Sequence, residues 1–109
     1  MAYRVELTKN AEAELQQLYL WVIERAPSRG AAWFNGLEQA ILSLEQYPTR
    51  CRIAPESSDE DRPVRVLNYG RRPDVYLVFF TVDEAVEVVH VVHIRRGKRL
   101  VPSREELKR

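Results

Sequence analysis

The sequence has 109 residues, of which 45% are hydrophobic and 30% are charged. This balance is typical of a soluble globular protein and unlike that of a disordered or membrane-embedded chain. No apolar run approaches the roughly 20 residues that cross a bilayer, and the N-terminus lacks the apolar stretch of a signal peptide, so we expect a cytoplasmic protein that does not bind membranes. The formal net charge of +1 gives no support for nucleic-acid binding from overall charge. The length predicts one domain over residues 1–109.

The basic residues are unevenly divided between two types, because only Lys9, Lys98 and Lys108 among the 17 are lysines. Arginine favours planar, bidentate contacts to phosphate or carboxylate over point-charge contacts. Arginine-rich coding in the genome would give the same skew. Cys51 is the only cysteine, which excludes an intrachain disulfide and gives no indication of an oxidising compartment.

The first quarter of the chain predicts a short strand followed by a helix. Residues 3–7 alternate between apolar and polar side chains, the pattern of a half-buried strand. Over residues 11–22 the apolar side chains recur at steps of three and four, the pattern of an amphipathic helix that Thr8 or Asn10 would cap. Pro27 ends this helix, because proline disfavours helical geometry in the residue before it.

A second helix is predicted to follow at once, with Ser28 as its cap and Pro48 beyond its end. Its apolar face comprises Trp33, Leu37, Ala40, Ile41 and Leu44. The short link between the two helices predicts a helical hairpin. We expect Trp33 to pack between the helices. Gly36 costs about 1 kcal/mol relative to alanine inside a helix, so we expect it to mark a close approach to the first helix.

Three strands are expected in the second half of the chain, after a loop over residues 49–63. The first begins near residue 64, the second spans residues 75–82, and the third follows a turn at residues 83–85. The order of elements predicts an α+β fold with an N-terminal strand, an α-helical hairpin and then a three-stranded antiparallel sheet segment. The helices are expected to cover one face of this sheet.

The second of these strands, residues 75–82, is apolar on both faces apart from Thr81 and the hydroxyl of Tyr76. This pattern indicates an interior strand that is covered on both sides. Two helices cover only one face, so the other face is expected to present apolar surface, which usually marks a partner site. A separate protein, a second copy of the chain in a homodimer and the chain's own tail are alternative covers for it.

The last strand, within residues 86–99, is rich in valine and ends in a cationic run. Successive strand side chains point to opposite faces, so His90 and His93, three residues apart, are not expected to share a metal ion. No metal site and no cofactor are predicted. By the same alternation His93 shares a face with Arg95, whereas His90 shares one with Ile94 and is interpreted as a core histidine.

Basic residues gather near the ends of the predicted strands. One group comprises Arg62, Arg65, Arg71 and Arg72, and the other comprises Arg95, Arg96, Lys98 and Arg99. If the sheet brings the two groups together, they form a patch that suits a phosphate backbone or an acidic protein surface. Tyr76 is a candidate for stacking beside it. A solvated rim without a ligand is the alternative interpretation.

Several segments, taken in order, resemble one known family. They are Val5–Thr8, Ala11–Leu15, Ala32–Leu37, Tyr47–Pro48, Pro63–Arg65, Val75–Phe80 and Val89–Arg96. Together they cover nearly the whole chain and are similar to the RelE/ParE family of bacterial toxins from type II toxin–antitoxin (plasmid-stabilisation) modules. The resemblance implies a compact toxin that a cognate antitoxin neutralises by covering apolar surface.

The same resemblance implies one of two activities. ParE-like members poison DNA gyrase and are not known to catalyse a reaction, whereas RelE-like members are ribosome-dependent mRNA endoribonucleases. The nuclease reaction needs a base, an acid and a cation for the phosphate, which RelE-like enzymes often supply with lysines and a late Tyr or His. Here Lys98 is the only lysine of the second half before the tail, and Tyr76 stands where a RelE-like enzyme carries a phosphate-binding arginine.

We therefore interpret the chain as closer to the ParE side of the family. The residues expected to bind the target or its phosphates are Arg65, Arg71, Arg72, Tyr76, Arg95, Arg96, Lys98 and Arg99. A nuclease that uses His93 and Arg95 as catalytic residues is the second hypothesis. A non-toxic relic that only binds an antitoxin is the third.

Overall fold

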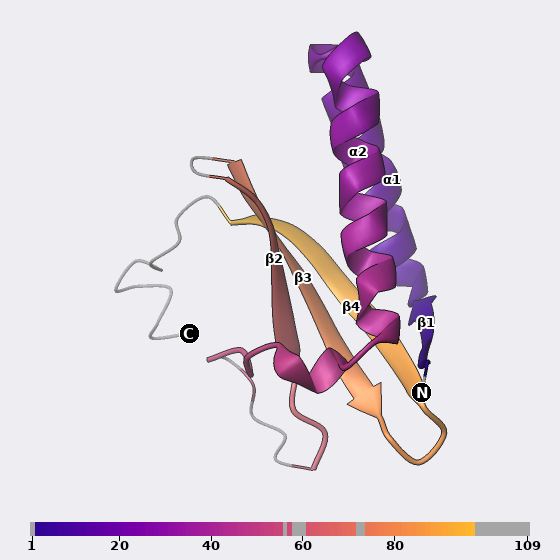
Figure 1. Ribbon diagram of the computed structural model, residues 1–109. Helices are drawn as coiled ribbons and strands as arrows, with labels where there is room; N and C mark the ends of the chain where they lie inside the picture. Colours follow the sequence, from indigo (N-terminus) through magenta and orange to yellow (C-terminus); the bar gives the residue numbers. More distant parts are fainter. Residues whose placement is uncertain (1, 56, 58–60, 72–73, 98–109) are drawn as a thin grey trace.

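The computed structural model describes residues 2–55, 57, 61–71 and 74–97 (Figure 1). Its elements in chain order are β1 (Arg4–Leu7), α1 (Lys9–Arg25), α2 (Pro27–Leu42), two short 3-10 helices (Ser43–Glu45 and Pro48–Arg50), β2 (Arg65–Arg71), β3 (Asp74–Asp83) and β4 (Val88–Gly97). The predicted α+β order of a strand, a helical hairpin and three further strands is confirmed. None of the helices in this part of the chain has the length and apolar content that crossing a membrane requires.

The four strands form one sheet in the order β1-β4-β3-β2. The three later strands pair antiparallel, whereas β1 pairs parallel with β4 at the edge of the sheet. Both helices lie on the same side of the sheet (Figure 1). One face is therefore covered by the hairpin, as the sequence predicts.

The caps of the two helices follow different rules. The Thr8 hydroxyl accepts a hydrogen bond from the Ala11 N–H at 3.1 Å, so the predicted cap of α1 is confirmed. The prediction of Ser28 as a cap is wrong, because α2 begins at Pro27 and no side chain caps it. Proline suits the first turn, where an N–H has no helical partner in any case. Only Ala26 separates the two helices.

Two predicted contacts of α2 are corrected by the structure. Trp33 does not pack between the helices, because its ring meets those of Tyr69 on β2 and Tyr76 on β3 at centroid distances of 5.1 and 5.0 Å. Gly36 approaches β2 rather than α1. The Tyr69 hydroxyl occupies the space that a Cβ at Gly36 would need, and it donates a hydrogen bond to the Trp33 carbonyl at 2.7 Å. The close approach to α1 is made by Gly30, whose added Cβ would lie 2.8 Å from Val22 Cγ1.

The core lies between the hairpin and the sheet. It comprises Ala11, Phe34, Leu37, Ile41, Leu44, Cys51, Val78, Phe80, Val89, Val91 and Ile94. Leu37 and Phe80 are completely buried, and burying side chains of this size contributes roughly 1.5–3 kcal/mol each. This cluster joins residues of both helices with residues of β3 and β4.

A β-bulge in β4 changes part of the prediction for its histidines: His93 shares a face with Arg95 as predicted, but His90 lies on that face too instead of sharing one with Ile94. Phe79 pairs with His93 but Phe80 pairs with Val91, so Val92 is an extra residue in β4. The bulge shifts the alternation by one residue. Ile94 therefore joins the core face, whereas His93 lies on the other face, in register with Phe79. The interpretation of His90 as a core histidine is also wrong, since it is half-buried and pairs with Thr81 on that same outer face.

We expect Gly36→Ala to destabilise the fold, although alanine normally favours a helix by about 1 kcal/mol. The added methyl group would overlap the Tyr69 hydroxyl and displace it from its hydrogen bond, at a cost of about 1–3 kcal/mol. Urea unfolding measures the effect. In a Tyr69→Phe background the same substitution should cost less, and a stabilising Gly36→Ala in the native background would contradict the close contact.

Candidate functional site

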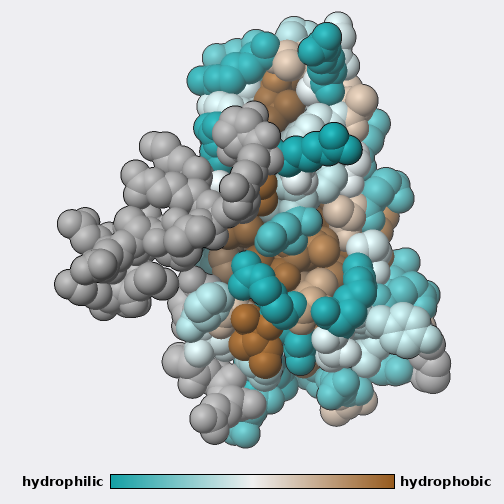
Figure 2. All heavy atoms as spheres, turned by 60° about the vertical axis from the view of Figure 1, so that its left-hand side comes forward, coloured by the Kyte–Doolittle hydropathy of each residue, from teal (hydrophilic) through white to brown (hydrophobic). Residues whose placement is uncertain are grey.

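The face of the sheet that points away from the helices carries both apolar and titratable side chains. Leu77 and Phe79 of β3 lie on it half-buried, in register with Arg95 and His93 of β4. Figure 2, which brings the left-hand side of Figure 1 forward, shows apolar side chains gathered in the middle of the view, with polar ones around and between them. Among the described residues no helix packs on this face, so we call it the open face.

Two side chains of α1 complete the edge of β4 where β1 ends. Glu14 accepts a hydrogen bond from the Ile94 N–H at 3.0 Å, and Asn10 donates one to the Val92 carbonyl at 3.4 Å. Backbone groups at a sheet edge need such partners. The Glu14 carboxylate and the Asn10 amide thus bond the backbone groups of β4 that a longer β1 would otherwise have paired with, next to the bulge.

The same two side chains meet His93. The ring Nδ1 lies 2.9 Å from Asn10 Nδ2, 3.4 Å from Glu14 Oε1 and 3.5 Å from Arg95 Nη2. Glu14 Oε2 also lies 4.0 Å from Arg95 Nε. We call these four residues the edge cluster. The His93 side chain is 38% exposed, so a ligand can reach an imidazole held between a carboxylate and a guanidinium, a set that can transfer a proton and bind an anion.

Sequence reasoning found His93 and Arg95 but missed Asn10 and Glu14. The available signal was their spacing of four residues, which places two polar side chains on one face of a helix. That Asn10 and Glu14 face β4 follows from the docking of α1 along the edge of that strand, which the sequence does not show.

The predicted basic groups do not form one patch. Arg65 lies at the end of the sheet where β3 finishes, and it donates hydrogen bonds to the carbonyls of Cys51 at 2.7 Å and Thr49 at 3.2 Å. Arg62 pairs with Asp83 at that same end. Because β2 runs antiparallel to β3, Arg71 lies at the opposite end.

Arg71 shares its end of the sheet with Arg96, which pairs with Tyr76 in register. Arg71 and Arg96 are exposed, and we call them the basic end. Tyr76 is only 4% exposed, because it lies under Trp33. The predicted residues Arg72, Lys98 and Arg99 lie outside the described residues.

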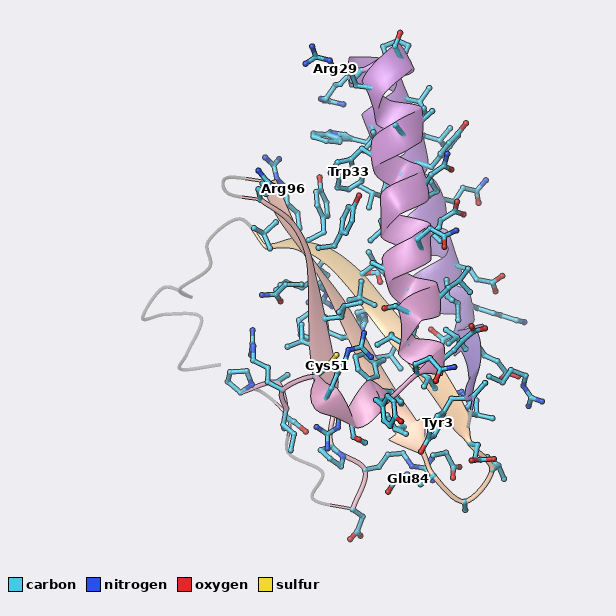
Figure 3. The ribbon with its side chains drawn as sticks, viewed as in Figure 1. Tyr3, Arg29, Trp33, Cys51, Glu84 and Arg96 are labelled. Atoms are coloured by element: carbon cyan, nitrogen blue, oxygen red, sulfur yellow. The ribbon has the colours of Figure 1, made fainter. Side chains whose placement is uncertain are left out.

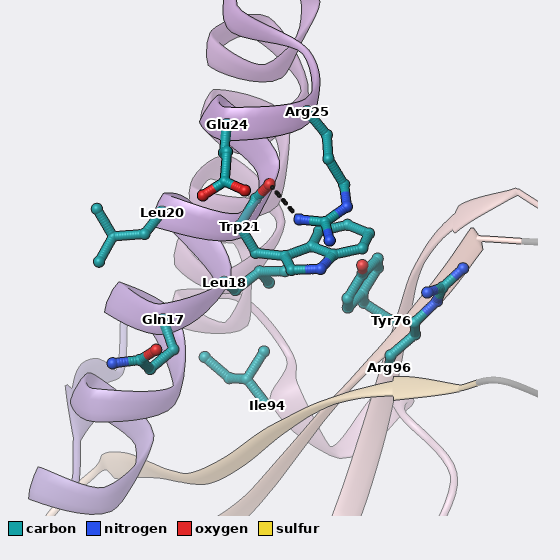
Figure 4. A pocket seen from close by; sticks show the side chains of 9 residues that line it. All are labelled: Gln17, Leu18, Leu20, Trp21, Glu24, Arg25, Tyr76, Ile94 and Arg96. Carbon is teal, nitrogen blue, oxygen red and sulfur yellow. Dashed lines mark hydrogen bonds between the residues drawn. The ribbon is translucent and has the colours of Figure 1, made fainter.

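A groove opens between α1 and this end of the sheet (Figure 4). Its volume is about 580 Å³, and it is lined by Gln17, Leu18, Leu20, Trp21, Glu24, Arg25, Tyr76, Ile94 and Arg96. The Arg25 guanidinium lies 4.1 Å from the centroid of the Trp21 ring, and that of Arg96 lies 5.5 Å from it. Sequence reasoning did not single out Trp21 or Arg25, because one pattern of apolar spacing describes only the core-facing side of α1.

Cys51 lies far from this groove, and Figure 3 shows it near the other end of the molecule from Arg29, Trp33 and Arg96. Burial raises the pKa of the Cys51 thiol, an effect that the neighbouring Arg50 and Arg65 partly oppose. A protonated thiol is a poor nucleophile. No group of three or more His, Cys, Asp and Glu side chains able to hold a metal ion is found among the described residues.

Comparison with known proteins relates this fold to toxins. Residues 5–101 match the family model described as the ParE toxin of the type II toxin–antitoxin system parDE. A chromosomal ParDE toxin–antitoxin system from P. aeruginosa superposes with a TM-score of 0.68 at 19% identity, covering 87% of this chain and 96% of that one.

Two RelE structures are also similar. A mutant of the E. coli toxin RelE in the free state gives a TM-score of 0.59 at 17% identity, covering 90% of this chain and 86% of that one. The RelE–RelB complex from the archaeon Pyrococcus horikoshii OT3 gives 0.59 at 20%, covering 91% and 99%. No curated protein sequence matches the chain.

We expect Glu14→Ala to leave the Ile94 N–H without its partner at the sheet edge and to cost about 1–3 kcal/mol of stability. The exchange of the Ile94 amide hydrogen should become faster than that of its neighbours in β4, as NMR would measure. Glu12→Ala, an exposed substitution on the same helix, serves as the control. Equal exchange of Ile94 in the native and Glu14→Ala proteins would show that the carboxylate does not protect this edge.

Proposed function

The chain belongs to the ParE toxin family of type II toxin–antitoxin systems, and from that premise we propose that it arrests growth by binding DNA gyrase with its basic end. The observation that carries this proposal is the match of residues 5–101 to the ParE model, because ParE-like members are the gyrase poisons of the superfamily. The basic end is the surface that we propose contacts gyrase. Guanidinium groups such as those of Arg71 and Arg96 bind the phosphates of DNA or the carboxylates of a protein in bidentate fashion.

The second part of the proposal is a cognate antitoxin that neutralises the chain. The apolar side chains of the open face, such as Leu77 and Phe79, lie half-buried, and no helix of the described part of the chain covers them. Covering such surface is a source of binding energy. One of the similar structures is itself a RelE–RelB complex, which supports a partner of this kind.

The edge cluster favours one second candidate, a ribosome-dependent endoribonuclease. His93 would exchange a proton with the reacting hydroxyl, Arg95 would hold the phosphate, and Glu14 would orient the imidazole. Glu14 Oε1 and Arg95 Nη2 lie 3.4 and 3.5 Å from His93 Nδ1, close enough for these two roles. We rank it second because the matched family model describes ParE rather than RelE.

Expression without the antitoxin tests both candidates. The gyrase proposal predicts growth arrest with a DNA-damage response, and inhibition of supercoiling when purified gyrase is mixed with the chain. In this case His93→Ala should retain full toxicity. Arrest with cleaved mRNA that His93→Ala abolishes would instead establish the nuclease. Absence of any arrest would mean that the chain is a relic that only binds its antitoxin.

We expect Arg71→Glu to reduce inhibition of gyrase at least tenfold, because it places a negative charge where the proposal requires a guanidinium. The concentration that halves supercoiling activity measures the effect. Arg52→Glu is the matched control, since Arg52 is also exposed but lies beside the opposite end of β2, where its carbonyl accepts a hydrogen bond from the Val66 N–H. Equal inhibition by the Arg71→Glu and native proteins would remove Arg71 from the target surface.

A further inference from the structure

The side of α1 that points away from the core carries a regular row of exposed residues. At about 100° of rotation per residue, the six side chains of this row lie within about a third of the helix circumference. The core-facing residues Ala11 and Val22 lie on the opposite side of the helix. We call the row the outer stripe, and it comprises Lys9, Ala13, Gln16, Gln17, Leu20 and Glu24.

The spacing of the outer stripe is the same from either end. Along the chain the steps between its residues are 4, 3, 1, 3 and 4. A second copy of α1 that runs antiparallel, with a two-fold axis between Gln16 and Gln17, therefore brings the stripe against itself in register. Lys9 then faces Glu24 of the second copy, Ala13 faces Leu20, and the two glutamines face each other.

Each of these pairings is chemically complementary. An ammonium group meets a carboxylate, and the small side chain of Ala13 leaves room for that of Leu20, which is 54% exposed. A glutamine amide both donates and accepts hydrogen bonds, so Gln16 and Gln17 suit each other at the axis. Two-fold symmetry repeats every pairing, so the stripe supplies an ion pair at each end of the contact.

The two charges of the outer stripe are placed unfavourably for α1 on its own. Lys9 is the first residue of the helix and Glu24 is the last but one, so each charge lies at the end of the helix dipole that has its own sign. Beside an antiparallel helix the same charges meet the opposite ends of that dipole. In the part of the chain that the structure describes, neither side chain forms an ion pair.

We propose that the chain forms an antiparallel homodimer through the outer stripe of α1. The inference goes beyond the proposed function and does not depend on it. Leu20 supplies the apolar contact, and the ion pairs of Lys9 with Glu24 fix the register. Glu24 is also at the rim of the groove beside the sheet, but the second copy lies along the outside of α1 rather than in that groove. A contact between single helices is small for a protein interface, so the dimer should dissociate on dilution.

Sedimentation equilibrium of the full chain measures the Kd of the dimer. Lys9→Glu should raise this Kd about tenfold or more, because both ion pairs become contacts of like charge. Glu24→Lys should do the same. An equimolar mixture of the two variant chains should associate with a Kd within about threefold of the native value, because each ion pair is restored with its signs exchanged. A variant that failed to fold could not be rescued in this way.

Arg52→Glu and Glu38→Lys are the matched controls, since they make the same changes of charge at exposed positions outside the stripe. Each should change the Kd less than about twofold. Thermal unfolding of every variant verifies that it is folded.

A native chain that stays monomeric at millimolar concentration, or a mixture that does not associate, would overturn the inference while leaving the toxin function intact. A dimer that both charge reversals retain would also overturn it and assign the association to another surface, such as the open face. A monomeric native chain whose affinity for its antitoxin falls in Lys9→Glu and Glu24→Lys would overturn it and assign the stripe to the antitoxin.

Discussion

The extra residue at Val92 determines which side chains of β4 face the core and which face outward. Because the bulge shifts the alternation once, Val89, Val91 and Ile94 all point into the core, while His93 and Arg95 point outward. A regular strand would have placed Ile94 on the outer face and His93 under the hairpin. Burying an imidazole among valines costs free energy unless it finds partners, so the core and the edge cluster depend on the same local irregularity.

The basic end and the groove between α1 and the sheet share one end of the molecule. Arg71, at the end of β2, and Arg96, near the end of β4, lie at that end of the molecule. The groove beside Trp21 extends from Arg96 along α1. A partner in the groove and a partner at the basic end would compete for the same guanidinium.

The elements and their order could be predicted from the sequence, because apolar periodicity distinguishes the helices from the strands. Thr8 could be predicted as one of two candidate caps of α1, and the structure selects it. Three features could not be predicted, since each depends on tertiary contacts. The bulge at Val92 has no local signal in a run of valines, and the contact of Gly36 with Tyr69 joins residues 33 positions apart. The separation of Arg65 from Arg96 follows from the antiparallel pairing of β2 with β3 and of β3 with β4. Of the four residues in the edge cluster, the sequence therefore predicts His93 and Arg95 as site residues but not Glu14 and Asn10.

The single-residue link at Ala26 has a consequence for recognition. With Gly30 seated against Val22, the end of the hairpin has little freedom to bend or to slide one helix past the other. The backbone of α1 that carries Trp21 and Arg25 is therefore held in place relative to α2 before any partner arrives. A rigid surface loses less conformational entropy on association than a flexible one, so most of the ordering cost of the complex would fall on the incoming polypeptide.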